Sequence, residues 1–264
     1  MSIEAPRLLD ASHIEAALAL SDEANWNQTA ADWAVFLRHG KVFGSFADGR
    51  LIATAAALPY GAGFGWVSMV LVTQSWRRRG IATRLVNAAT EALTASGRAA
   101  LLDATAAGEA VYARMGFVGL CGMARWEGPG GGGSGGGDGG CDLLADRRAF
   151  GADRRFLLED FLARPGSLCF GADEGFAILR AGRRASQIGP VVGAAAAERL
   201  LHAAIDAATG PAFADILDAG ASLLPGLAAR GWREQRGFTR MIFGGAGLPG
   251  EPALLAVAAG PEFG

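Results

Sequence analysis

The chain has 264 residues, with 24 lysines and arginines against 26 acidic residues, so its formal net charge is −2. A near-neutral charge excludes a global field that would attract nucleic acid or an anionic membrane surface. The length suits two domains of about 100 to 150 residues each. No stretch approaches the roughly 20 apolar residues that a membrane-spanning helix needs, and the first ten residues lack a signal-peptide pattern. We therefore expect a cytoplasmic protein.

The cysteines and histidines show no spacing typical of a metal site or a disulfide framework. Cys121, Cys141 and Cys169 are an odd number at wide spacing, without a Cys-x-x-Cys pair. We expect buried, reduced thiols and no bound metal.

The first half of the chain alternates between apolar runs typical of strands and amphipathic stretches typical of helices. Ser12 with Glu15, and Thr29 with Asp32, are capping boxes that predict two helix starts. Ala-Asp-Gly-Arg at 47–50 predicts a hairpin turn. The predicted elements, in chain order, are a strand at 6–9, helices from 12 and 29, strands at 41–46, 51–58 and 66–72, a helix from 81 that Gly97 ends, a strand at 101–105, a helix at 109–115 and a strand at 116–120.

Residues 128–140 contain ten glycines in thirteen positions. Because this composition cannot build a core, we expect a flexible linker over residues 128–141, between domains at 1–127 and 142–264. A phosphate-binding cradle is the alternative, but no strand runs into the segment and no Lys with Ser or Thr follows at P-loop spacing.

The second domain repeats the order of the first more faintly. Its predicted elements are a helix at 156–162, strands at 167–170, 176–180 and 186–192, a helix at 194–208 and a strand at 212–217. Residues 223–232 then align with the first domain so that Gly231 stands opposite Gly116. We infer an internal duplication, although two unrelated α/β domains would also match loosely. The predicted fold class is α/β, an α+β type with a mixed sheet, in two tandem domains.

An arginine-rich loop follows the strand at 66–72 and carries Arg77, Arg78 and Arg79. Gly80 then begins a helix, where the first N–H groups have no intrahelical partner and the dipole is positive. Such a turn binds phosphate. Gly80 and Ala82 let the backbone approach closely, and Thr83 adds a hydroxyl donor. A solvated basic helix start is the alternative, but cations are disfavoured at that end unless an anion is present.

Two motifs in the first domain resemble those of the GNAT superfamily of N-acetyltransferases. The stretch LVTQSWRRRGIATRLV resembles its acyl-CoA pyrophosphate motif, Q/R-x-x-G-x-G/A, with Arg77, Gly80 and Ala82 in the matching positions. YARMGF, at 112–117, resembles the downstream motif Y-x-x-x-G-F. The two occur in the family's order on a strand-helix-strand frame.

The resemblance covers about residues 6–125, with a divergent copy from 142, and looks like the tandem-GNAT subgroup. It implies that acetyl-CoA is the co-substrate, and that its acetyl group passes to a primary amine of a small molecule or peptide by direct attack in a ternary complex. The second domain has no arginine loop, and Leu227 stands where the first has Tyr112. We expect this degenerate domain to bind no CoA and to complete the substrate cleft, bury a sheet edge or form a homodimer.

Two other functions stay open at this point. A catalytically silent, CoA-binding regulatory module would share the same loop. Nucleic-acid binding through Arg77 to Arg79 is weaker, because no aromatic platform or wider basic stripe accompanies them.

The resemblance also implies which residues bind the cofactor. In this family the strand before the loop splays from its neighbour, and its backbone binds the pantetheine arm. By position this falls on Met69, Val70 and Val72, with the N–H of Val70 as donor to the thioester carbonyl. Core packing of their side chains is compatible with this role. Many members carry asparagine seven residues before the tyrosine, where this chain has Thr105.

Tyr112 stands at the family's tyrosine position, which implies a general acid for the expelled thiolate. The alternative is a half-buried tyrosine that packs beside Met115. An amine must lose a proton before it attacks, so a base is needed. Asp103, Glu109 or a chain of waters could serve, although Asp103 could merely cap a turn and Glu109 could face solvent.

Substrate selectivity in this fold usually comes from the loop between the first two helices. Here that loop holds Asn25, Trp26 and Asn27. An aromatic ring beside amides could hold an amine through cation–π contact and hydrogen bonds. Trp26 could equally staple the helix that Thr29 starts.

Overall fold

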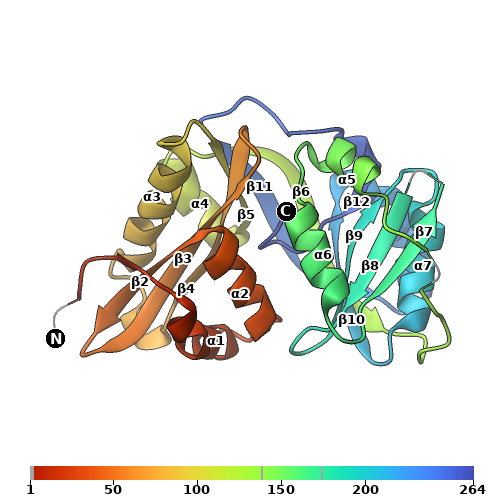
Figure 1. Cartoon of the computed structure of the whole chain (residues 1–264), viewed down its shortest axis with the longest axis horizontal. Helices are drawn as coiled ribbons and strands as arrows, with labels where there is room; N and C mark the ends of the chain where they lie inside the picture. Colours follow the sequence, from red (N-terminus) through yellow and green to blue (C-terminus); the bar gives the residue numbers. More distant parts are fainter. Residues whose placement is uncertain (1–2, 138, 174) are drawn as a thin grey trace. The chain divides into compact units, whose positions relative to one another are not determined.

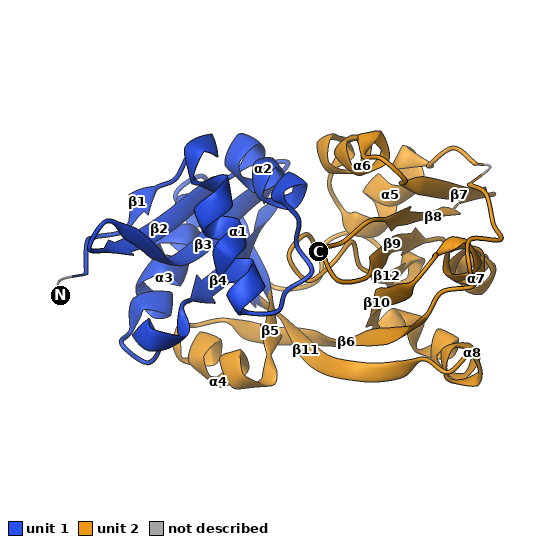
Figure 2. Ribbon diagram, turned by 90° about the horizontal axis from the view of Figure 1, so that it is seen from below, with its two compact units in different colours: residues 1–102, 242–245 blue, residues 103–241, 246–264 orange. Residues whose placement is uncertain are grey.

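The computed structural model describes residues 3–137, 139–173 and 175–264, so residue 138 of the expected linker lies outside it. The chain divides into two compact units (Figure 2). Unit 1 comprises Met1–Leu102 and Ile242–Gly245, and unit 2 comprises Asp103–Met241 and Ala246–Gly264. The division therefore passes through two strands, β5 (Ala99–Thr105) and β11 (Arg233–Phe243).

Unit 1 has the element order that the sequence predicts. Its elements are β1 (Arg7–Leu8), α1 (Ile14–Glu23), α2 (Ala30–His39), β2 (Lys41–Ala47), β3 (Arg50–Tyr60), β4 (Phe64–Val72), α3 (Ile81–Thr94) and the first part of β5. The strands lie in the order β1-β2-β3-β4-β5. The pairs from β1 to β4 are antiparallel and β4 pairs with β5 in parallel, so the sheet is mixed.

Helices cover both faces of this sheet. Figure 1 shows α1 and α2 on one face of β2, β3 and β4, and α3 on the other. The buried side of α3 has the helical spacing seen in the sequence and consists of Ile81, Leu85, Val86, Ala89, Thr90 and Leu93. Each fully buried Leu, Ile or Val contributes about 1.5–3 kcal/mol relative to exposure. This packing fixes α3, and therefore the loop before it, against the sheet.

The helix caps show one correct and one wrong prediction. Thr29 caps α2, since its hydroxyl accepts from the N–H of Asp32 at 3.3 Å and the Asp32 carboxylate accepts from Thr29 N at 2.7 Å. Ser12 does not cap α1. A 3-10 turn precedes that helix, and Asp10 caps it by accepting from Ser12 N at 2.9 Å. A carboxylate two residues earlier outcompetes the serine hydroxyl.

Unit 2, orange in Figure 2, contains the rest of the described chain. Its elements are α4 (Ala106–Arg114), β6 (Val118–Pro129), α5 (Leu143–Phe150), α6 (Arg155–Ala163), β7 (Leu168–Ala172), β8 (Gly175–Arg180), β9 (Ser186–Val192), α7 (Ala197–Ala207), β10 (Pro211–Leu217), α8 (Leu224–Ala229), most of β11 and β12 (Leu255–Val257). Its strands lie in the order β11-β6-β10-β12-β9-β8-β7. No helix in the described part of the chain is long and apolar enough to cross a membrane.

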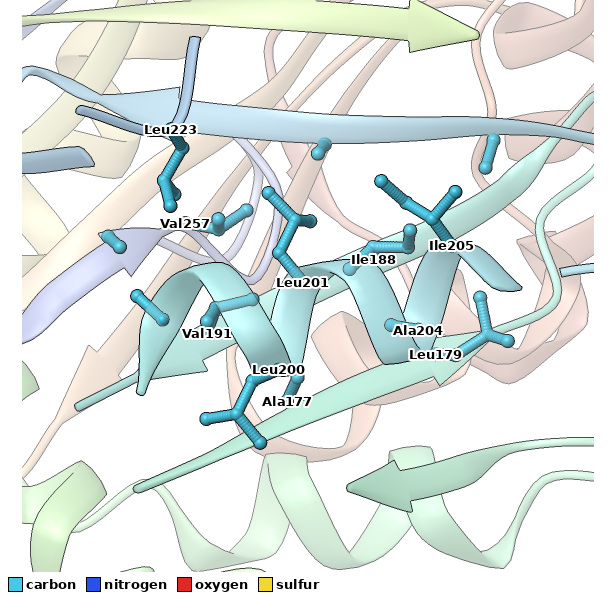
Figure 3. Close-up of a cluster of buried hydrophobic side chains, with 14 of the residues drawn as sticks. Ala177, Leu179, Ile188, Val191, Leu200, Leu201, Ala204, Ile205, Leu223 and Val257 are labelled. Carbon is cyan, nitrogen blue, oxygen red and sulfur yellow. The ribbon is translucent and has the colours of Figure 1, made fainter. Parts of the chain in front are cut away.

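The core of unit 2 forms where α7 packs on its strands. Figure 3 shows Leu200, Leu201 and Ile205 of α7 beside side chains of the neighbouring strands, such as Ile188. Leu227 of α8 joins the same cluster and is fully buried. The position that matches Tyr112 in the second repeat is therefore an apolar core position.

The described part of the glycine-rich segment belongs to unit 2, and the expectation that no strand runs into this segment is wrong. Gly128 and Pro129 are the last residues of β6, paired with β10. The N–H of Gly131 donates to the carbonyl of Ile205 at 2.8 Å. A Cβ on Gly131 would lie 2.5 Å from the Cα of Asp206. Glycine here permits backbone to lie directly on backbone.

Cys141 and Cys169 form a disulfide, with their Cα atoms 6.1 Å apart. The expectation of reduced thiols is therefore wrong for these two, while Cys121 is free. The sequence does not predict this pairing, because 28 residues separate the two cysteines and no local motif links them. The bond fastens the end of the glycine-rich segment to β7.

Candidate functional site

Strand β4 leaves its parallel neighbour before it ends. Its pairing with β5 joins Phe64, Gly65 and Trp66 to residues 99–101, and no further pair follows in the described residues. The remainder of β4, up to Val72, keeps β3 as its partner. The splay that the family resemblance implied is thus present at this strand, and it exposes one backbone edge.

A bulge lies in the splayed part of β4. The register shifts between Ser68 and Leu71, so Met69 and Val70 stand opposite the single residue Ala55 of β3. Met69 adopts φ 53°, and its carbonyl accepts a buried hydrogen bond of 2.8 Å from Thr54 Oγ1. A bulge bends a strand and re-aims its backbone groups. The Met69 side chain is buried, so this residue can meet a ligand through its backbone.

The arginine loop follows β4 directly, and all three of its arginines are exposed. Arg77 Nε donates to the carbonyl of Val72 at 3.0 Å, and the Arg79 guanidinium lies 4.7 Å from the ring centre of Trp76. Arg78 has φ 62°. None of the three forms an ion pair with a described residue, so their charges are available to a ligand.

Helix α3 begins at the end of this loop without a side-chain cap. Gly80 is its N-cap in the left-handed conformation, φ 73°, which favours glycine. The N–H groups of Ile81, Ala82 and Thr83 have no hydrogen-bond partner in the ranges that the structure describes. A Cβ placed on Gly80 would meet nothing within 4 Å, so the space beside these donors is open. Free N–H groups, a positive helix end and unpaired arginines fit a diphosphate.

Glu23, the last residue of α1, fastens that helix to the start of the loop. Its carboxylate accepts from Thr73 Oγ1 at 2.6 Å and from Gln74 N at 2.6 Å. These hydrogen bonds lower the pKa of Glu23, and the bond from Thr73 has the largest effect. The positive charge of Arg77 lowers the pKa further. Sequence reasoning missed Glu23, because no local pattern signals a contact across fifty residues.

The predicted substrate loop continues from Glu23. Asn25 is exposed with φ 58°, Trp26 is half-buried, and Asn27 is buried. The Glu23 contacts therefore bring the two predicted binding segments of unit 1 together. Gln28, next in the chain, has a buried Oε1 without a hydrogen-bond partner among the described residues. Substrate binding by Asn25, Trp26 and Asn27 stays a prediction.

In unit 2, Tyr112 lies on α4 and is half-buried. Its ring makes an edge contact with Phe117 at 6.1 Å, and its hydroxyl has no hydrogen-bond partner in the described part of the chain. Burial raises the pKa of this phenol, which keeps its proton in place. Thr105 precedes α4 and makes no side-chain cap. Glu109 accepts from Thr239 Oγ1 at 2.9 Å.

The carboxylate of Asp103, one of the predicted bases, is buried in an ion pair. Arg240 Nε and a terminal Arg240 nitrogen donate to its two oxygens at 2.8 and 3.0 Å. Burial raises the pKa of Asp103, and the charge of Arg240 opposes this shift. The carboxylate cannot accept a proton without weakening that bidentate pair.

The same arrangement recurs around β10. Arg125 of β6 donates through Nε and a terminal nitrogen to Asp215 at 2.8 and 2.8 Å, and both residues are buried. Gln187 Nε2 adds a third donor to Asp215 at 3.0 Å. One pair thus joins β6 to β10 and the other joins β5 to β11, so each links a strand of one repeat to a strand of the other within unit 2.

Comparisons with known proteins assign both halves of the chain to one family. Residues 8–117 match the model described as "Acetyltransferase (GNAT) family", and residues 143–255 match that described as "Acetyltransferase (GNAT) domain". The chain belongs to the GNAT family of acetyltransferases. Two GNAT domains stand in tandem, as the duplicated sequence pattern predicted.

Solved structures with the same fold support the tandem arrangement. A Pyrococcus horikoshii protein classed as an acetyltransferase aligns with a TM-score of 0.82 at 18% identity, covering 99% of this chain and 96% of that one. A GCN5-related N-acetyltransferase from Sphaerobacter thermophilus has a TM-score of 0.63 at 15% identity, over 93% and 98%. A tandem GNAT protein from the clavulanic acid biosynthesis pathway has a TM-score of 0.57 at 16% identity, over 92% and 98%. No curated protein matches the sequence.

The second domain of this tandem GNAT protein differs from the first at both motif positions. The turn from β9 to α7 runs through residues 193–196, which are glycine and alanines in place of arginines. Leu227, opposite Tyr112 in the repeat, is fully buried. These residues supply neither the arginines nor the phenol that the first domain has at the matching positions.

Proposed function

We propose that this GNAT protein transfers the acetyl group of acetyl-CoA to a primary amine of a small molecule or peptide, through its first domain. The start of α3 carries the proposal, because three N–H donors without partners follow three arginines that pair with no described acid. A structural helix start would carry a capping residue and no cluster of cations.

Two segments of unit 1 would bind two different parts of acetyl-CoA. Arg77, Arg78, Arg79, Gly80, Ala82 and Thr83 would bind the pyrophosphate, and the free backbone edge of β4 at Met69, Val70 and Val72 would bind the pantetheine arm. Acetyl-CoA supplies the activated acetyl group, as a thioester whose C–S bond breaks when the amine nitrogen forms the amide bond. Thr105 would contribute at most a hydroxyl, in place of the family's amide.

Tyr112 would donate its phenolic proton to the leaving sulfur. Its hydroxyl has no partner among the described residues, and burial, which raises its pKa, keeps the proton in place until it is needed. The amine must also lose a proton. Because both oxygens of Asp103 are engaged with Arg240, a chain of waters is the better acceptor. Asp103 would then position β5 and β11 and have no direct part in proton transfer. Asn25, Trp26 and Asn27 would contact the amine substrate.

The second domain would bind no CoA, so one acetyl-CoA should bind per chain. Calorimetry with acetyl-CoA tests this stoichiometry, and two equivalent sites would contradict it. We keep a cytoplasmic location, and a monomer or homodimer without nucleic-acid, membrane or metal partners, as expectations.

A screen for thiol release from acetyl-CoA tests the function itself. The panel comprises polyamines, amino acids, aminoglycosides and short peptides, each with the purified chain. Amine-dependent thiol release that Arg78→Ala weakens through a raised KM for acetyl-CoA is the expected result. Tight binding of acetyl-CoA without turnover of any amine would favour a silent CoA-binding module.

A further inference from the structure

The second domain contains a strand splay like that of the first. In the described residues, β9 and β10 pair in parallel over 186–188 and 212–214 alone, as β4 and β5 do over 64–66 and 99–101. Beyond these pairs β9 and β10 separate, and each continues for several residues. The place that would receive the pantetheine arm in the first domain therefore has a counterpart within unit 2.

The bulge of β4 also has a counterpart, on β9. The register shifts beside Gly189 and Pro190, which stand opposite a single residue of β8. In β4, Met69 and Val70 stand opposite a single residue of β3 in the same way. Pro190 thus occupies the place of Val70, and proline has no N–H group. The second splay lacks the donor that the first would offer to a thioester.

The C-terminal segment, residues 254–264, fills this second splay. Its strand β12 pairs antiparallel with β9 on one side and with β10 on the other, and so lies between them. The N–H of Gly193 donates to the carbonyl of Leu254 at 2.8 Å. The N–H of Ala258 donates to the backbone carbonyl of Asp215 at 2.9 Å. The backbone edges that separate here are thus bound by the chain's own backbone.

The C-terminal segment lies directly on the bulge of β9. A Cβ on Gly189 would overlap the carbonyl oxygen of Ala258, so glycine permits this close contact. The buried guanidinium of Arg180 joins the two strands, because it donates to the carbonyl of Gly189 at 3.3 Å and to that of Ala259 at 2.8 Å. The segment therefore covers the part of the second splay that matches the thioester position of the first.

The end of the C-terminal segment is held by side chains. Phe263 is fully buried and makes an edge contact with Phe161 of α6, with ring centres 5.3 Å apart. The backbone carbonyl of Gly264 accepts from a terminal nitrogen of Arg154 at 2.7 Å. Backbone hydrogen bonds along a strand, with a side-chain anchor in a pocket, are the contacts of a peptide bound by strand addition.

We propose that the second domain carries a binding site for an extended peptide backbone, and that its ligand is the chain's own C-terminal segment. The contact is autoinhibitory, because it closes the second splay to any other ligand. Main-chain hydrogen bonds supply the affinity, and the tether gives the segment a high effective concentration. The contacts all lie within unit 2, so the site does not depend on the proposed acetyl transfer.

Cleavage at Gly247 tests the site on a chain that has already folded. Gly247 is exposed, and a Cβ there would meet nothing within 4 Å, so a protease recognition sequence can be inserted. After the cut, residues 248–264 are a separate peptide. A fluorescent synthetic copy of this peptide should exchange into the cut chain and saturate at one per chain. Exchange should be faster than global unfolding, which hydrogen exchange in α7 measures. A peptide of scrambled sequence should not bind.

Two variant peptides show whether the segment binds through the splay. Ala258→Pro removes the N–H that donates to Asp215 and should bind about tenfold more weakly. Ala253→Gly changes an exposed residue before β12 and should bind like the unmodified copy.

Exchange no faster than global unfolding would show that the segment is an inseparable part of the core, and would overturn the proposal. Equal affinities of the two variant peptides, or loss of the cut segment without binding of its synthetic copy, would overturn it as well.

Discussion

Arg125 and Arg240 occupy equivalent positions in the two GNAT repeats, and each makes a bidentate ion pair with an aspartate of the other repeat. Asp215 serves the first arginine and Asp103 the second, and all four side chains are almost fully buried. A buried ion pair tolerates loss of one member poorly, because the other charge is left without a partner. The two repeats thus share a reciprocal contact, whereas the arginine loop occurs in the first repeat and not in the second.

Asp103→Asn should destabilise the protein by about 3–5 kcal/mol, since it leaves Arg240 buried with a neutral partner. Urea unfolding measures the change. The double variant Asp103→Leu with Arg240→Met removes both charges and should recover most of the loss. If the double variant folds and still acetylates amines at a normal rate, Asp103 is not the base. A stable double variant with its pH profile abolished would restore that role.

Tyr112→Phe should lower kcat at least about 100-fold, the scale of general acid catalysis, and leave acetyl-CoA binding unchanged. Burial raises the pKa of Tyr112 above its ordinary 10.0. An acid must be protonated to work, so the rate should fall only as pH rises beyond that value. Tyr60 is the other of two tyrosines in the sequence, and Tyr60→Phe serves as the control. Equal kcat values for both variants would contradict the role of Tyr112.

Glu23→Ala should weaken acetyl-CoA binding about threefold to tenfold, because the loop start loses two hydrogen bonds to a charged acceptor. Because Glu23 is exposed to solvent, we expect the loss of affinity to be small for hydrogen bonds to a charged group. Calorimetry gives the affinity. Glu15→Ala, on the exposed side of the same helix, should bind acetyl-CoA normally, and a similar loss there would point to a general effect on α1.

Reduction of the Cys141–Cys169 bond should lower the free energy of unfolding by about 3–4 kcal/mol, the chain-entropy estimate for a loop of this length. Thermal unfolding with and without reductant measures the shift. Cys141→Ser should unfold at one temperature in both conditions, whereas Cys121→Ser should keep the sensitivity of the unmodified chain. If the unmodified chain unfolds at the same temperature with and without reductant, the disulfide is absent.

Local pattern predicted much of the fold, because its signals lie within a few residues. The hairpin at 47–50, the cap at Thr29 and the apolar stripe of α3 are of this kind. Strand β11 escaped prediction because polar and charged residues fill its first half and burial begins only near Phe238. Helix α5 and strand β12 were missed as well.

The residues of the candidate site also fall into those that the sequence predicts and those that it does not. The arginine loop and Tyr112 belong to short motifs that can be recognised in the sequence. Other contacts join residues that are far apart in the sequence. Glu23 and Thr73 are 50 residues apart, and Asp103 and Arg240 are 137 residues apart. Such contacts depend on where the strands lie, and no single stretch of sequence encodes them.

The end of β11 determines the order in which the two units can complete their folding during synthesis on the ribosome. Residues Ile242–Gly245 belong to unit 1, where a Cβ on Gly245 would lie 3.1 Å from Ala99 of β5. Residues 1–241 must therefore be synthesised before the first unit receives its last strand. Until then the nascent chain presents an open sheet edge, a surface on which other unfinished chains could pair. Acetyl transfer by the first domain would have to wait for translation of the second.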